Sequence, residues 1–157
     1  MRPYPEELLR ILQTGVMAHF APEVQSTYGR AQIAFSMLLF GVAQRDYDSA
    51  VPDLLEANRA LREMLDRART ALDSVPGEEA AAASARLATL PAPAATPRLS
   101  ALRTEFDGLR AAICELAPLL ERAADDDALA PLREARGAIY DWLAADARRR
   151  VVPILSA

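Results

Sequence analysis

The sequence predicts an all-α fold, a single-domain bundle of five to six helices. Three observations lead to this prediction. Apolar residues recur every three or four positions along most of the chain, which is the period of an amphipathic helix. The run from Ile33 to Ala43 is apolar apart from Ser36 and Gly41. The chain of 157 residues is also long enough to bury one core without a metal ion or a disulfide.

The apolar run lies in the segment 28–44, YGRAQIAFSMLLFGVAQ, which is expected to form the central helix. A helix without a polar side belongs inside a bundle or in a membrane. A run of about 11 residues is too short to cross a bilayer, which takes about 20 residues. The other helices are therefore expected to surround 28–44.

The first helix is expected over residues 5–20. Pro5 suits a first helical turn, where its missing N–H would have no partner in any case. Pro22 ends this helix or starts it again, and Ser26 or Thr27 can cap the next one. The apolar positions of the first helix recur at helical spacing and are Leu8, Leu9, Leu12, Val16 and Phe20.

A turn at residues 45–49 is expected to separate 28–44 from a third helix that runs to about residue 72. Asp48 or Ser49 can cap this helix, and Pro52 then lies in its first turn, where a missing donor costs little. One apolar stripe follows and consists of Leu54, Leu61, Leu65, Ala68 and Leu72.

The middle of the chain changes composition twice. Residues 78–90 are rich in alanine and predict a helix with few large side chains to bury. Residues 91–97, PAPAATP, predict a stiff extended linker between two halves of the single domain 1–157.

The next helix is expected from residue 97 and carries a heptad seam held for three heptads. Its members are Leu99, Leu102, Phe106, Leu109, Ile113, Leu116 and Leu120. Such a seam requires another helix alongside it, in this chain or in a second copy. Asp125, Asp126 and Asp127 end this helix and cap the last one. The apolar face of the last helix consists of Leu132, Ala135, Ile139, Trp142 and Leu143.

The two halves of the chain resemble each other. Asp48 and Asp127 are each followed four residues later by a proline, Pro52 and Pro131, and then by matching leucine, glutamate and alanine positions. One interpretation is two duplicated αα-hairpins. The other is chance similarity between two capped amphipathic helices in a chain rich in Arg, Ala and Leu.

Composition restricts the possible functions. The net charge of −4 argues against a nucleic-acid binder, which usually needs a basic face. All 18 basic residues are arginine, so Schiff-base chemistry and a P-loop lysine are excluded. The single Cys114 suits a reducing compartment, and no signal peptide or transmembrane segment is recognised. The expected location is cytoplasmic, without a membrane partner.

Catalytic and metal-binding sets are missing from the sequence pattern. Metal sites need clusters of His, Cys or carboxylate residues, and His19 and Cys114 each stand alone. A nucleophile–histidine–acid set would depend on His19, and nothing indicates its partners. We therefore expect no catalytic residues, no metal ion and no cofactor.

The candidate ligand-binding or partner-binding residues are Tyr28, Arg30, Arg45 and Tyr47, at the two ends of the 28–44 helix. Arginine and tyrosine are the residue types that anchor protein interfaces. Structural capping of the helix ends explains the same residues and is the favoured interpretation.

Two resemblances are present. Residues 45–57, RDYDSAVPDLLEA, resemble the turn and second helix of a tetratricopeptide hairpin, with Tyr47, Ala50, Leu54 and Ala57 on that family's spacing. The first fifty residues look like the opening of a family of small uncharacterised bacterial all-helical proteins. They share its amphipathic start, a proline near position 22, a Gly-Arg pair and a buried helix rich in alanine. The first resemblance implies a partner-binding αα-hairpin, and the second implies no catalytic residue.

The expected function is a non-catalytic accessory or protein-interaction bundle, a homo-oligomer that self-associates through the 99–120 seam and its neighbour. One alternative is a binding module for a small apolar or acyl ligand beside 28–44, with Arg30 or Arg45 meeting an anionic end. A third possibility is a metal-independent enzyme that uses carboxylate, Arg and Tyr side chains.

Overall fold

A computed structural model describes residues 4–149, and they are all-α as predicted. These residues form five α-helices and no β-strand. The helices are α1 (Pro5–Gly15), α2 (Thr27–Leu72), α3 (Glu78–Ala88), α4 (Leu99–Arg122) and α5 (Leu132–Arg149). None of the helices between residues 4 and 149 combines the length and apolarity needed to cross a bilayer.

The contacts of the chain divide it into two compact units, the first ending at Pro52 and the second starting at Asp53. The division lies within α2, so this helix contributes to both units. The linker predicted at 91–97 therefore does not separate two halves of the fold. It lies inside the second unit, where it connects α3 to α4.

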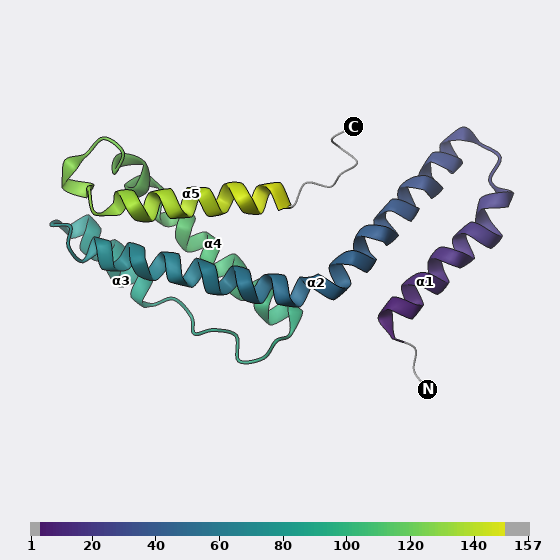
Figure 1. The fold of residues 1–157 in the computed structure, drawn as a ribbon, viewed down its shortest axis with the longest axis horizontal. Coiled ribbons are helices and arrows are strands. Elements are labelled where there is room, and N and C mark those ends of the chain that lie inside the picture. The colour runs from purple at the N-terminus through teal and green to yellow at the C-terminus, as the bar shows by residue number, and fades with distance from the viewer. Residues whose placement is uncertain (1–3, 150–157) are drawn as a thin grey trace. The chain divides into compact units, whose positions relative to one another are not determined.

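The first unit is a helical hairpin. α1 is followed by a π-helical turn (Val16–Phe20) and a short 3-10 turn (Ala21–Glu23), and the chain then returns along the first part of α2 (Figure 1). The predicted start at Pro5 is confirmed: the Tyr4 N–H donates to the Glu7 carboxylate at 3.0 Å and closes the first turn.

The bend of the hairpin is held by Ser26, one of the two predicted caps. The Ser26 hydroxyl accepts a hydrogen bond from the Gly29 N–H at 3.0 Å. A Cβ atom on residue 29 would lie 2.3 Å from Cγ1 of Val24 and 2.9 Å from the Ser26 hydroxyl oxygen. Glycine is therefore required at position 29, because any other side chain would displace the residues that form the bend.

The predicted turn at 45–49 is wrong. α2 runs without interruption from Thr27 to Leu72, with Pro52 in its interior. Asp48 and Ser49 favour a cap, but such local preferences are worth only about 1 kcal/mol. A continuous helix instead keeps most of the backbone hydrogen bonds of this region, and loses one at Pro52.

Two further expectations depended on that turn and are corrected with it. Segments 28–44 and 49–72 are parts of one helix and do not form an αα-hairpin. The structure therefore does not contain two duplicated hairpins. The bend implied by the tetratricopeptide resemblance at residues 45–57 is likewise replaced by continuous helix.

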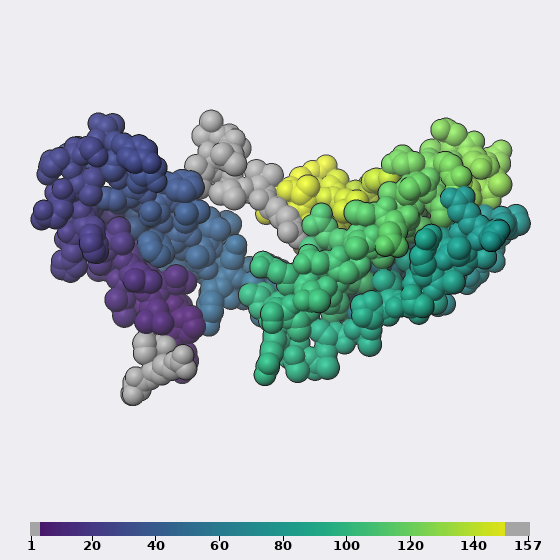
Figure 2. Space-filling view, turned by 180° about the vertical axis from the view of Figure 1, so that it is seen from behind, coloured from purple at the N-terminus to yellow at the C-terminus, as the bar shows by residue number. Residues whose placement is uncertain are grey.

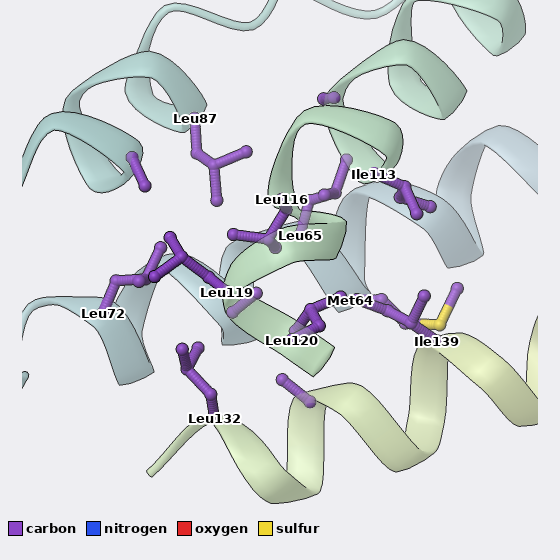
Figure 3. Close-up of a cluster of buried hydrophobic side chains, with 14 of the residues drawn as sticks. Met64, Leu65, Leu72, Leu87, Ile113, Leu116, Leu119, Leu120, Leu132 and Ile139 are labelled. Atoms are coloured by element: carbon purple, nitrogen blue, oxygen red, sulfur yellow. The ribbon is translucent and has the colours of Figure 1, made fainter. Parts of the chain in front are cut away.

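The second unit contains the hydrophobic core. The second part of α2, together with α3, α4 and α5, directs buried side chains toward one another, as Figure 3 shows for ten labelled residues. The predicted stripes are confirmed. Leu61, Leu109 and Ile139, from three different helices, are completely buried. α3 coincides with the alanine-rich segment that was predicted to be helical. It contributes Ala80, Ala83 and Leu87 to the core.

A buried ion pair fastens the proline-rich segment to this core. The guanidinium of Arg62 on α2 contacts one carboxylate oxygen of Glu105 on α4, with Nη2 at 2.6 Å and Nε at 2.7 Å. The other oxygen of Glu105 accepts the backbone N–H of Ala94 at 2.9 Å. Beside it, the Asn58 amide donates to the Leu102 carbonyl at 3.0 Å. Residues 91–97 are therefore held in place and do not act as a free linker.

In the connection between α4 and α5, one of the three predicted aspartates caps a short 3-10 turn that precedes the last helix, and not the last helix itself. The Asp126 carboxylate accepts the Ala128 N–H at 2.9 Å and begins a 3-10 turn. The Arg133 guanidinium then reaches back to the Ala123 carbonyl and to the Asp127 carboxylate. These contacts fix the direction in which α5 returns along the core.

Candidate interaction surface

The hairpin has no buried side chain among its described residues, 4–52. This overturns the prediction that 28–44 is the central helix of a bundle, since Phe35 is 55% exposed and Leu39 is 52% exposed. The all-round apolar pattern indicates a helix that favours neighbours on several sides. Within the first unit, however, the chain supplies only α1.

Large apolar side chains are concentrated on this hairpin. Of the twelve exposed large hydrophobic residues in the described chain, ten lie between residues 4 and 52. We call eight of them the hairpin surface: Leu8, Ile11, Leu12, Met17, Phe20, Tyr28, Phe35 and Leu39. Figure 2 shows the elements that carry them, α1 in purple and the first part of α2 in blue, lying side by side.

The pattern of exposure gives α2 two distinct faces. Ile33, Met37 and Phe40 recur every three or four residues and are half-buried. Phe35 and Leu39 are exposed and lie about 200° further round the helix, at about 100° per residue. One face of α2 is therefore partly covered, and the opposite face presents aromatic and aliphatic side chains to solvent.

α1 has the same division. Leu9, Gln13 and Val16 are half-buried at helical spacing. Leu8 and Ile11 are exposed on the other side, at 46% and 61%. Both helices of the hairpin thus carry an uncovered apolar face.

Charge is absent from the middle of the hairpin. Residues 31–44 contain no ionisable side chain, and neither do residues 11–18. The charges lie toward the ends of the helices, where both signs occur. A surface with this pattern is suited to apolar contact and gives little electrostatic selection.

The four residues predicted to bind a partner do not converge. Tyr28 is 75% exposed, and the Arg30 guanidinium donates to the Val24 carbonyl at 3.4 Å, next to the bend. Arg45 lies 3.7 Å from the Asp46 carboxylate in an exposed pair. Arg30 and Arg45 are about 22 Å apart along the helix axis, at 1.5 Å per residue. Tyr28 belongs to the hairpin surface, whereas Arg30 helps to hold the bend, and a binding role for the set stays a prediction.

The cavities described in the structure lie in the second unit. A groove of about 450 Å³ runs between α2 and α5, and a smaller one of about 220 Å³ adjoins the end of α3. Neither is lined by residues 28–44. The groove between α2 and α5 has Met64, Arg67, Thr70, Ala71, Pro131, Glu134 and Ala138 among its lining residues.

Titratable groups give little indication of chemistry. Within residues 4–149, no group of three or more His, Cys, Asp or Glu side chains could hold a metal ion. The pKa of Tyr140 is raised above its ordinary value, chiefly because its hydroxyl donates a hydrogen bond to the Glu121 carboxylate and also because of burial. His19 lies in the exposed π-helical turn, and Cys114 is exposed on α4.

The heptad seam of 99–120 is not available to a second copy. From Leu102 to Leu120 its members are buried in the core of their own unit, and only Leu99 is exposed. The expected self-association through this seam is therefore wrong. The helix that the seam required is supplied by the same chain.

Comparisons with protein-family models, with curated proteins and with solved structures found no match to this chain. Sequence reasoning missed the hairpin surface because it placed 28–44 in the core. The signal that could have indicated it is the combination of an all-round apolar helix with a stretch, residues 11–18, that also lacks ionisable side chains.

Proposed function

We propose that this chain is a non-catalytic interaction protein that uses its N-terminal hairpin as the docking element and its second unit as a folded body. The observation behind this proposal is the contrast between the two units. The second unit buries its apolar stripes in its own core, whereas the first exposes ten large hydrophobic residues and buries none of its described side chains.

The size of the exposed area supports a binding role. The three aromatic side chains of the hairpin surface alone, exposed by 55–75%, amount to roughly 300–500 Å² of surface, since one aromatic side chain covers about 150–250 Å². Five further large apolar side chains, exposed by 46–61%, add to this area. Folded monomers rarely expose continuous apolar patches above a few hundred Å², and larger patches mark interaction sites. An apolar surface of this size favours a covering partner.

The residue types also fit an interface. Phe20, Tyr28 and Phe35 are aromatic, and aromatic residues are enriched in the buried centres of protein interfaces. Met17 adds a flexible side chain that adapts to a partner surface. The second unit lacks a comparable surface in its described part, where Leu55 and Leu99 are the exposed large hydrophobics.

Site-specific photocrosslinking in cells tests this proposal. A benzophenone amino acid is placed at position 39, on the hairpin surface, or at position 99, on the second unit. The two positions are matched, because both are leucines that are roughly half-exposed, at 52% and 43%.

A covalent protein adduct of defined mass is expected from position 39 and not from position 99. Absence of an adduct at position 39, or equal adducts at both positions, would contradict an interaction role for the hairpin. The chain with the probe is compared with wild type by tryptophan fluorescence, to confirm that the second unit is folded.

A further inference from the structure

We infer that the partner of the hairpin surface is a second copy of this chain, and that the exposed helix faces of the two hairpins pack against each other. This inference rests on the proposed function and specifies its partner. In a four-helix bundle each helix has two neighbours. The hairpin by itself gives α1 and α2 only one neighbour each, which is why one apolar face of each helix is uncovered.

The exposed area approaches what a stable dimer needs. Specific interfaces bury about 800 Å² on each partner. The three aromatic side chains of the hairpin surface present roughly 300–500 Å², and its five other large apolar side chains, exposed by 46–61%, bring the hairpin toward that area. One hairpin can therefore cover another without leaving a large uncovered patch on either.

The spacing of the exposed residues fits helix-on-helix packing. On α2, Tyr28, Phe35 and Leu39 are separated by seven and four residues, the intervals of a heptad seam. On α1, Leu8 and Leu12 are separated by four. Seams of this kind pack against other helices whose apolar residues have the same spacing. A second hairpin provides two such helices, its own α1 and α2.

The charge distribution is compatible with self-pairing. In a twofold dimer the same patch occurs on both partners, so a surface with one dominant sign of charge would repel its copy. Residues 11–18 and 31–44 carry no ionisable group, so no such repulsion arises in the centre. Between residues 4 and 52 there are five acidic and three basic residues. This excess of acidic residues disfavours an anionic lipid surface, which selects basic amphipathic helices.

The test is sedimentation velocity of the full chain at about 1–100 µM, a range at and above the dissociation constants of specific interfaces, of which the weaker ones are about micromolar. Wild type is expected at twice the 17.1 kDa of one chain. The double variant F35E/L39E is expected to be monomeric, with dimer affinity reduced about 100-fold or more, because unpaired carboxylates would be buried in an apolar seam. The matched control L99E changes one exposed leucine of the second unit and is expected to remain dimeric.

Folding is monitored separately, because the variants must differ only in association. Trp142 is the only tryptophan and lies in the second unit, so its fluorescence transition in urea is expected to be the same in all three proteins. Phe35 and Leu39 are exposed in the single chain, so glutamate at these positions leaves the fold of one copy intact.

The outcomes separate this inference from the proposed function. A wild type that is monomeric over the whole range overturns the second copy as partner. If crosslinking at position 39 then gives an adduct with another protein, the interaction role holds and only the partner is different. If neither a dimer nor an adduct is found, both proposals fail. A dimer that survives F35E/L39E, or dissociates equally in L99E, also overturns the hairpin as the interface.

Discussion

Replacement of Glu105 by glutamine should destabilise the second unit by about 3 kcal/mol. The carboxylate of Glu105 is 7% exposed and accepts from the Arg62 guanidinium at 2.6 Å and from the Ala94 N–H at 2.9 Å. Glutamine keeps the shape but removes the negative charge, so the partly buried Arg62 loses its counter-charge. Removal of one member of a buried pair typically costs 3–5 kcal/mol. Since Arg62 keeps 20% exposure to water, the lower end of that range applies.

The assay is urea unfolding followed by the fluorescence of Trp142. This side chain packs against Phe106 with ring centroids 6.3 Å apart, so its signal reports on the core near Glu105. With a denaturant dependence of about 1–3 kcal/mol per M, a loss of about 3 kcal/mol lowers the urea midpoint by roughly 1–3 M.

A matched control is available on the same helix. Glu121 on α4 is exposed and lies 3.8 Å from Arg136, so the same Glu-to-Gln change there should cost less than about 1 kcal/mol. The double variant R62M/E105Q should recover part of the lost stability, because it removes the unpaired cation while glutamine still accepts the Ala94 N–H. An E105Q protein within 0.5 kcal/mol of wild type, or a double variant no more stable than E105Q, would refute this explanation of how the segment 91–97 is held.

Three further outcomes are expected. L109A should lower the unfolding free energy by about 2–5 kcal/mol in the same assay, because Leu109 is completely buried and its truncation leaves a cavity. G29A should reduce the helical circular dichroism signal of the hairpin without moving the fluorescence transition, since a Cβ there meets Val24 at 2.3 Å. E121Q should lower the pKa of Tyr140 toward its ordinary value of 10.0, measured by ultraviolet titration at 295 nm. Because the pKa of Tyr140 is raised in the folded chain, its contribution to stability is present below about pH 10 and is lost as the pH rises further; in E121Q the unfolding midpoint should depend less on pH in this range.

The sequence predicted the helices of the second unit well. Leu61, Leu65 and Leu72 were assigned to one stripe, and all three are buried. The alternation of apolar residues by three and four is a local property of the chain, and it fixes which side of each helix must be covered. The caps at Ser26 and Asp126 were also predictable, because each requires only a short polar side chain next to a free N–H.

The sequence did not predict the single helix α2. Asp48 and Ser49 are cap residues and Pro52 suits a first turn, so the local signals favoured a break at 45–49. Local preferences of about 1 kcal/mol do not decide between a break and a continuous helix, because the outcome depends on what each arrangement allows the neighbouring segments to bury. The tertiary structure decides this point.

By itself, the sequence determined that the chain is helical and which faces of its helices are apolar. Only the tertiary structure decided which of those faces are covered, and by which segments. The 99–120 seam finds its partner helices within the second unit, whereas the apolar faces of the hairpin stay exposed. The spacing of apolar residues indicates which face of a helix is apolar and favours burial. It does not indicate which segment covers that face, because burial depends on contacts between residues distant in the sequence.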